Sequence, residues 1–198
     1  MGESLQTMYL VRHGETAWSR SGQHTGITDL PLTELGEKQA AHLQGRLAGI
    51  SFAKVLTSTS TRAKRTCALA GFGEVVQPDT NLVEWHYGEY EGLTSAEIHQ
   101  RRPGWQIFKD GCPGGESPEQ AAARADLVLQ QVRSIDGNVL IFSSGHFSRM
   151  LALRWLGLAS EAGRFFALDT ASVSVLAYEG MKQPVIRLWN DTHHLIDK

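Results

Sequence analysis

Short apolar runs alternate with helical segments along the chain, and this alternation most constrains the fold. The apolar runs predict β-strands at about residues 7–12, 54–58, 74–77, 138–143, 172–178 and 185–189. The spacing of apolar residues between them predicts helices at about residues 34–48, 62–70, 95–101, 118–134 and 147–156. Strands that alternate with helices favour a largely parallel sheet with helices on both faces. The sequence therefore predicts an α/β fold, a three-layer α/β/α sandwich with a mostly parallel sheet and an antiparallel edge strand.

Start and stop signals support these elements. Thr94-Ser-Ala-Glu97 and Ser117-Pro-Glu-Gln120 both fit a capping box, the pattern in which two side chains satisfy the first free N–H groups of a helix. Gly71 and Gly157 follow the ends of two predicted helices. A short loop through Glu179-Gly180 joins the last two strands, which predicts an antiparallel hairpin at the edge of the sheet.

The length and charge of the chain exclude several classes of protein. Its 198 residues suit one domain, predicted to span residues 1–198. With 19 basic and 21 acidic residues the formal net charge is -2, so no overall positive field attracts nucleic acid or an anionic membrane. No signal segment is recognisable, and no apolar run approaches the ~20 residues that span a bilayer. We therefore expect a cytoplasmic protein.

Cysteine and histidine patterns give no sign of a metal centre. The chain has 2 cysteines, Cys67 and Cys112, without CxxC or zinc-finger spacing, and both are expected to be reduced thiols. His193 and His194 are adjacent but lack a third ligand, a pattern typical of solvent-facing side chains. We expect neither a metal ion nor another cofactor.

Basic and polar side chains gather at the predicted ends of three strands. The first strand ends in Arg12-His13-Gly14, the second leads to Arg62 at the start of a helix, and a later one ends in Ser144-Gly145-His146. In open α/β sheets, ligands bind beyond the carboxyl ends of the strands. Guanidinium, imidazole and hydroxyl groups that converge there, with glycines that allow close backbone approach, predict a pocket for phosphate.

Five motifs, in order along the chain, resemble those of the histidine phosphatase superfamily, the phosphoglycerate-mutase-like proteins. They are VRHGETAW (11–18), GQHTGITDLPLTELGEKQA (22–40), TSTSTRAKRT (57–66), LVEWHYGEYEGLT (82–94) and SGHFSRMLALRWLGL (144–158). Together they cover nearly the whole chain. The combination of GQHTGITDLPLT, DGCPGGES and GHFSRM is most similar to the acid-phosphatase-like and sugar-bisphosphatase-like branches of that family.

The resemblance implies a covalent mechanism in which His13 attacks a phosphoryl group and carries it as phosphohistidine until water removes it. Arg12 and Arg62 would neutralise and orient the phosphoryl oxygens. Glu84, in a Leu-x-Glu-x-x-x-Gly pattern, would donate the proton to the leaving group. The same resemblance implies three smaller residues on the phosphate or substrate side: Ser19, Thr25 and Gly26.

One position departs from the family pattern. Members typically carry His-Gly-x-x-x-Arg after this strand, and alignment on Gly145 and Arg149 puts Ser144 where a second catalytic histidine belongs. A serine hydroxyl can still donate to a phosphoryl oxygen, but the replacement removes a positive charge and predicts weaker transition-state stabilisation. His146, two residues later, either compensates or contacts the substrate on its own account. Arg149 either contacts a second substrate anion or pairs with an acid on its helix.

The sequence favours a phosphatase over two alternatives. Cofactor-dependent mutases of this family have a longer insertion with an Asn-Lys motif after the glutamate, and the short stretch from Gly92 to Ser117 lacks it. We therefore expect hydrolysis of small phosphomonoesters, such as sugar phosphates, by a protein that binds neither nucleic acid nor membrane. The sequence is compatible with a homodimer. The alternatives are a cofactor-dependent phosphoglycerate mutase and, because of Ser144, a weakly active pseudo-enzyme that binds phosphorylated ligands.

Overall fold

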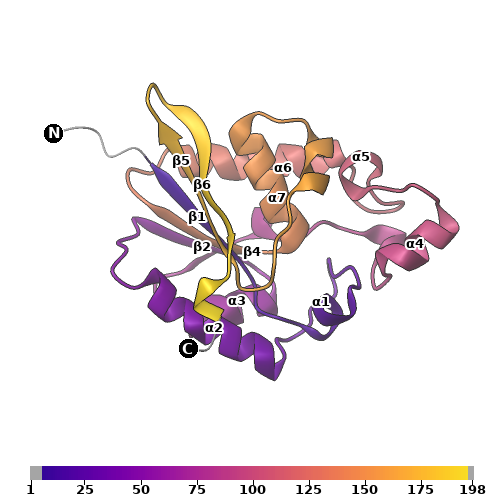
Figure 1. Ribbon diagram of the computed structural model, residues 1–198, viewed down its shortest axis with the longest axis horizontal. Coiled ribbons are helices and arrows are strands. Elements are labelled where there is room, and N and C mark those ends of the chain that lie inside the picture. Colours follow the sequence, from indigo (N-terminus) through magenta and orange to yellow (C-terminus); the bar gives the residue numbers. More distant parts are fainter. Residues whose placement is uncertain (1–5, 196–198) are drawn as a thin grey trace.

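The computed structural model describes residues 6–195 and contains a six-stranded sheet in the order β3-β2-β4-β1-β5-β6 (Figure 1). Its strands are β1 (Thr7–Arg12), β2 (Lys54–Ser58), β3 (Gln77–Asp79), β4 (Val139–Ser143), β5 (Val173–Glu179) and β6 (Gln183–Asp191). Strands β1 to β4 run parallel, whereas β5 is antiparallel to both of its neighbours, β1 and β6. The predicted mostly parallel sheet with an antiparallel edge is confirmed.

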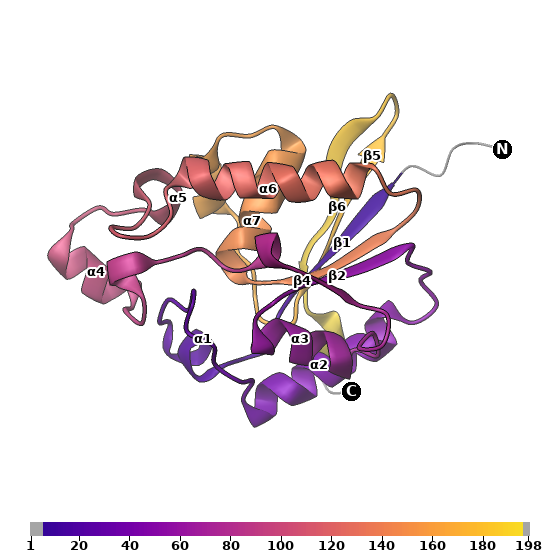
Figure 2. The ribbon, with the colours of Figure 1, turned by 180° about the vertical axis from the view of Figure 1, so that it is seen from behind.

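Helices cover both faces of this sheet. The α-helices of residues 6–195 are α1 (Ala17–Ser21), α2 (Glu34–Leu47), α3 (Thr61–Leu69), α4 (Ser95–Arg101), α5 (Ile107–Asp110), α6 (Pro118–Arg133) and α7 (Gly145–Leu156). Figure 2 shows α2 and α3 on one face and α6 and α7 on the other. Within residues 6–195, no helix has the length and the apolar character needed to cross a membrane.

The buried strand β4 explains why two layers of helices are needed. Side chains of a strand point alternately to opposite faces, and all of β4 is buried. Leu140 and Phe142 belong to the hydrophobic cluster under α2 and α3. Val139 and Ile141 belong to the larger cluster under α6 and α7. The predicted three-layer sandwich is therefore confirmed.

Local signals in the sequence account for most of the element ends. Both predicted capping boxes are present, with Thr94 and Glu97 at the start of α4 and Ser117 and Gln120 at the start of α6. Helix α7 ends at Gly157, which adopts the left-handed backbone conformation that glycine tolerates best.

The third strand lies later in the chain than the sequence predicts. It spans Gln77–Asp79, whereas the apolar run predicts a strand at about residues 74–77. The reason is that this run forms a turn, in which the N–H of Val75 donates to Phe72 O, and Phe72 and Val76 pack against the core below α2 and α3. The two shortest helices, α1 and α5, are absent from the sequence prediction because 5 and 4 residues carry too little periodicity.

Candidate active site

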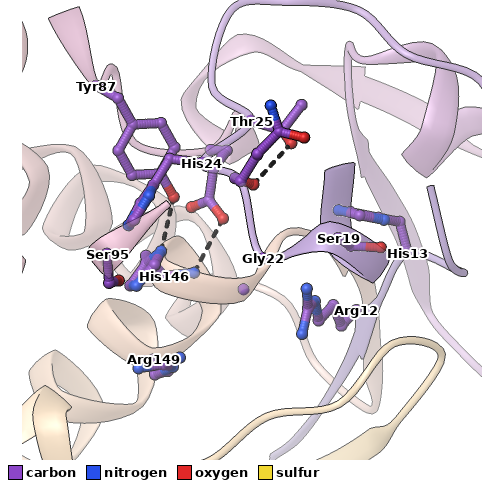
Figure 3. Close-up of a pocket in the computed structure, with 13 residues that line it drawn as sticks. Arg12, His13, Ser19, Gly22, His24, Thr25, Tyr87, Ser95, His146 and Arg149 are labelled. Atoms are coloured by element: carbon purple, nitrogen blue, oxygen red, sulfur yellow. Dashed lines mark hydrogen bonds between the residues drawn. The ribbon is translucent and has the colours of Figure 1, made fainter. Parts of the chain in front are cut away.

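Three of the residues predicted to bind phosphate, Arg12, His13 and Ser144, lie at the carboxyl ends of β1 and β4. These strands are paired in register, with Arg12 opposite Ser143, and the N–H of His13 donates to Ser143 O at 3.0 Å. A cavity of about 240 Å³ opens at this edge of the sheet (Figure 3). Several residues predicted for the site line it: Arg12, His13, Ser19, Thr25, Glu84 and His146.

The imidazole of His13 is held neutral with one ring nitrogen free. The side chain is buried, and Nδ1 lies 2.8 Å from Gly14 O. Because a carbonyl can only accept, Nδ1 carries the proton and the lone pair of Nε2 is available. Burial, and then the charges of Arg62 and Arg12, hold the pKa of this imidazole well below its usual value of 6.5. The ring is therefore uncharged near neutral pH and can act as a nucleophile.

The loop that carries His13 fits tightly against helix α2. The N–H of Gly14 donates to Thr66 Oγ1 at 3.0 Å, and a Cβ atom on Gly14 would lie 2.3 Å from Gly36 O. A Cβ atom on Gly36 would lie 2.1 Å from Glu15 O. Both distances are far inside van der Waals contact, so neither position admits a side chain. This backbone contact fixes the loop after β1.

Carbonyl oxygens hold two guanidinium groups, that of the partly buried Arg12 and that of the buried Arg62. Arg12 Nη1 donates to Leu168 O at 2.5 Å. Arg62 Nη2 donates to the carbonyls of Thr25 and Gly26 at 3.0 and 3.1 Å, and its Nη1 donates to Thr28 O. The Nε atoms of both arginines are buried without a hydrogen-bond partner among the described residues. Each arginine is thus fixed in place. Its Nε–H group and its positive charge remain available to bind an anion.

Glu84 lies at the N-terminus of helix α7. Its Oε1 accepts the N–H groups of Phe147 at 2.8 Å and of Trp85 at 3.0 Å, and its Oε2 accepts the N–H of His146 at 3.0 Å. Ser144, at the cap position of the helix, makes no side-chain cap bond. The carboxylate of Glu84 therefore satisfies free donors of α7 in its place.

The backbone around Glu84 is fixed by Arg124 from helix α6. Its Nη1 donates to Val83 O at 2.6 Å, and its Nη2 donates to Glu84 O at 3.3 Å and to Glu116 at 2.8 Å. On the side of Arg12, a Cβ atom on Gly145 would lie 3.4 Å from Arg12 Nε and 3.6 Å from Glu84 Oε2. The carboxylate and the Arg12 guanidinium thus both lie close to the Cα of Gly145, where a side chain would meet them.

Ser144 lies beside His13, and its hydroxyl has no hydrogen-bond partner among residues 6–195. It follows the end of β4, as His13 follows the end of β1, and these two strands pair in register. Its side chain is fully buried, and Oγ has no hydrogen-bond partner within the part of the chain that the structure describes. An oxygen that is buried and unbonded is available to a ligand that reaches it.

Gly26 and Arg62 line a neighbouring cavity instead of the one around His13. This second cavity, of about 510 Å³, shares Glu84 with the first. The N–H of Gly26 donates to the Glu91 carboxylate at 2.9 Å, and a Cβ atom on Gly26 would lie 2.5 Å from Trp85 O. Gly26 thus carries the loop that Arg62 binds, and glycine is required there because of the close approach to Trp85.

The end of the cavity away from His13 contains residues to which the sequence analysis gives no role: His24, Tyr87 and Ser95. With His146 and Arg149, they lie apart from Arg12 and His13 in Figure 3. His24 and Tyr87 occur inside the motifs GQHTG and WHYG, which were the only signal for them. Among the described residues, no group of three or more His, Cys, Asp or Glu side chains could hold a metal ion.

Comparison with known proteins finds matches that cover most of the chain. Residues 8–192 match the model of the histidine phosphatase superfamily (branch 1). The chain is 42% identical to an acid phosphatase of Mycobacterium tuberculosis over 191 residues, which cover 92% of each chain. It is 29% identical to sedoheptulose 1,7-bisphosphatase of Saccharomyces cerevisiae, over 95% of this chain and 80% of that one. A solved structure of an open reading frame product of Mycobacterium tuberculosis superposes with a TM-score of 0.86 at 38% identity, over 95% of this chain and 99% of that one.

Proposed function

Because the chain belongs to the histidine phosphatase superfamily, we propose that it hydrolyses small phosphomonoesters through a phosphohistidine intermediate on His13. The observation that carries this proposal is a buried, neutral imidazole with Nε2 free, which lies close enough to the guanidinium groups of Arg12 and Arg62 for their charges to lower its pKa. Donors and cations of this kind suit the oxygens of a phosphoryl group. The likeness to an acid phosphatase and a sugar bisphosphatase supports the same class of substrate.

In the first step, the lone pair of His13 Nε2 attacks phosphorus, and the bond between phosphorus and the ester oxygen breaks. Glu84, in its protonated form, gives its proton to the departing oxygen, so that the alcohol leaves uncharged. Arg12 and Arg62 offset the negative charge of the phosphoryl oxygens throughout. Ser144 Oγ donates to one of these oxygens, at the position where the family pattern has a histidine.

In the second step, water attacks the phosphorus of phosphohistidine. The carboxylate of Glu84 accepts a proton from this water, which restores the acid form, and the phosphorus–nitrogen bond breaks with its electron pair returning to Nε2. Inorganic phosphate leaves, and the enzyme is back in its starting state. Glu84 can serve both steps because it borders the cavity from a fixed position on the N-terminus of α7.

The experiment is a phosphate-release assay on phenyl phosphate, sugar phosphates and nucleotides, comparing wild type with His13→Ala and with His42→Ala, an exposed histidine on helix α2. We expect turnover in wild type and in the His42 variant, and none above background in the His13 variant. Quenching with ³²P-labelled substrate should yield an acid-labile, alkali-stable phosphoprotein, which the His13 variant does not form. Full activity in the His13 variant contradicts the proposed mechanism.

The same assay separates two other functions. A phosphoglycerate mutase would need a bisphosphorylated primer and would pass the phosphoryl group to an acceptor hydroxyl instead of water. The buried serine at position 144 favours a second candidate, a protein that binds phosphorylated ligands with little turnover. Ligand binding without phosphate release from any ester would indicate that candidate.

A further inference from the structure

Two successive peptide units follow strand β1, and other parts of the chain hold both of them. In the first unit, between His13 and Gly14, the carbonyl accepts the N–H of Ala171 at 3.1 Å and the N–H donates to Thr66 Oγ1 at 3.0 Å. These two bonds fix the backbone of His13. The imidazole itself is bonded to the second unit.

The second unit, between Gly14 and Glu15, holds the ring. Its carbonyl accepts the proton of His13 Nδ1 at 2.8 Å, and its N–H donates to the side chain of Gln39, on helix α2, at 3.0 Å. A backbone N–H can only donate, so the Gln39 atom that faces it is the amide oxygen, Oε1. The C=O and N–H of a planar trans unit point in opposite directions. Gln39 and the imidazole therefore lie on opposite sides of this peptide unit.

Gln39 is held at this position from more than one side. Its Oε1 also accepts the hydroxyl of Thr170, in the segment before β5, at 3.2 Å. The side chain is partly buried, which limits competition from water for the same oxygen. The close backbone contact between Gly14 and Gly36 keeps α2 itself against the loop. The amide oxygen thus has a fixed place relative to the peptide unit that it binds.

The bond from the imidazole to Gly14 opposes the other influences on the ring. Burial and the charges of Arg62 and Arg12 lower the pKa of His13, whereas the bond to the Gly14 carbonyl raises it. Hydrogen bonds in a chain polarise one another, so an acceptor on the N–H of a peptide unit makes its carbonyl a stronger acceptor. Gln39 therefore strengthens the carbonyl that keeps the proton on Nδ1 and the lone pair on Nε2.

Several charged side chains on the same segments have partners of their own. The pairs are Glu15 with Thr33, Glu37 with Arg65, and Asp169 with Asn190. A substitution of Gln39 leaves these pairs in place, together with the charges of Arg12 and Arg62. Its effect on the imidazole is then transmitted through the peptide unit.

We propose that Gln39 is a positioning residue for the reaction at His13: through the peptide unit between Gly14 and Glu15, its amide oxygen holds the imidazole in the tautomer and orientation that present Nε2 to the phosphoryl group. Because Gln39 acts from the side of the unit away from the ring, it contributes to the chemical step and not to the binding of the ester. This inference rests on the proposed function, in which His13 is the nucleophile.

Single-turnover kinetics test the chemical step directly. Gln39→Met keeps the length of the side chain but removes the amide oxygen. We expect the rate constant for phosphorylation by ³²P-labelled phenyl phosphate to fall by about tenfold, as for one lost hydrogen bond, with less than about a twofold change in the half-saturating concentration. Gln39→Glu, which keeps an acceptor, should retain most of the rate. Gln44→Met, at an exposed position of the same helix, is the matched control and should behave as wild type.

The pH profile separates positioning of the ring from a role in folding. The acid limb of kcat/KM reports the loss of the proton that blocks Nε2, and the ionisation of the substrate contributes equally in every variant. A weaker Gly14 carbonyl lowers the pKa of His13, so Gln39→Met should move this limb to lower pH by about half a unit. Gln39→Glu should move it to higher pH by about half a unit or more.

Two comparisons make the pH profile decisive. Gln44→Glu puts the same charge on α2 without a bond to the loop, and it should move the limb much less than Gln39→Glu. A loss of stability alone lowers activity without moving the limb. If Gln39→Met does not fold, Gln39→Glu still decides the question. An acid limb that stays at the wild-type pH in Gln39→Glu, or a loss that is confined to the half-saturating concentration, overturns the proposal.

A measurement without turnover separates this inference from the proposed function. The ¹⁵N shifts of an imidazole distinguish a protonated from an unprotonated ring nitrogen. At pH 7.5 we expect His13 to carry its proton on Nδ1 in wild type and in Gln39→Glu, and to show both neutral tautomers in Gln39→Met. If wild type releases no phosphate, or if His13→Ala remains active, the phosphatase mechanism is wrong, but these shifts still test Gln39. The same His13 tautomer in folded Gln39→Met as in wild type overturns the inference.

Discussion

The carboxylate of Glu84 accepts the backbone N–H of Phe147 at 2.8 Å, so the group that we propose as the catalytic acid also closes the N-terminus of helix α7. The helix dipole and three N–H donors fix its position. The same carboxylate therefore couples the stability of α7 to the chemistry at His13, and a substitution there should affect both.

Glu84→Gln should lower both stability and activity. An amide keeps the size of the side chain, but its NH₂ group replaces an acceptor oxygen and faces backbone N–H donors. We expect the free energy of unfolding to fall by about 1–3 kcal/mol in urea denaturation. We also expect kcat/KM for alkyl phosphates to fall by about 10²–10⁴-fold.

In Glu84→Gln, the loss of kcat/KM should be much smaller for p-nitrophenyl phosphate, because its leaving group needs no proton. Glu89→Gln, at an exposed position, is the matched control and should change neither property. An equal loss of kcat/KM for both kinds of ester would show that Glu84 is not the acid of the first step.

Ser144→Ala should separate activity from stability. The Ser144 hydroxyl has no partner in the described part of the chain, so its removal costs no internal hydrogen bond and the melting temperature should stay the same or rise. If Oγ donates to a phosphoryl oxygen, kcat/KM should fall by about tenfold. Ser148, whose hydroxyl is also buried and unpartnered among the described residues but lies one turn further along α7 from the end of β4, provides the control Ser148→Ala, which should leave kcat/KM unchanged.

Ser144→His tests whether the replaced histidine limits the rate. The His146 ring is bonded to Tyr87 at the end of the cavity away from His13, so it does not take the position beside His13 that the family pattern gives to a histidine. We therefore expect Ser144→His to raise kcat/KM by about tenfold or more, as a gained donor in an oxyanion site does. A rate at or below that of wild type in a folded variant would contradict this expectation.

Stability should decrease as the pH falls below about 6.5. Burial depresses the folded-state pKa of His13, His24 and His146, whereas in the unfolded chain these rings bind a proton at about pH 6.5. Below that pH the unfolded state binds more protons than the folded state, so the free energy of unfolding falls with pH, by up to about 1.4 kcal/mol per unit for each ring. Urea midpoints at pH 7.5, 6.5 and 5.5 measure the decrease, which should be shallower in His146→Phe.

Arg62 and Arg65 should respond very differently to the same substitution. Arg62 is buried and donates to three carbonyls of the loop at 25–28, whereas Arg65 pairs with Glu37 and both side chains are about half exposed. Arg62→Met should cost about 2–4 kcal/mol of stability and abolish most activity, because it leaves the carbonyls unpaired and removes a charge from the phosphate site. Arg65→Met should change stability by less than about 1 kcal/mol. Thermal melts and phosphate release measure both.

The sequence predicted the layers of the fold because its patterns are local. Uniformly apolar runs such as Val139–Ser143 can only be buried on both faces, and the capping boxes at Thr94 and Ser117 begin helices whatever the tertiary contacts are. The third strand was misplaced because Phe72 and Val76 reach the core from a turn. Apolar composition alone does not distinguish such a turn from a strand.

The candidate site was predictable only in part. Arg12, His13 and Glu84 follow from strand ends and from the family motifs, and the structure brings them to one cavity. The stacking of His24 on His146 and the bond from Tyr87 to His146 join residues up to 122 positions apart, and no sequence spacing encodes such contacts. Nor does spacing reveal that Glu84, and not Ser144, satisfies the N–H groups of α7.

Because of the contact between Gly14 and Gly36, the position of His13, which we propose as the nucleophile, depends on the position of helix α2. Its backbone bears directly on the segment that holds the imidazole, with no intervening side chain to absorb a displacement. Any change that tilts or slides α2, even at its far end, will be transmitted to residue 13. Repacking of that helix during engineering or evolution is therefore restricted to changes that leave its axis in place.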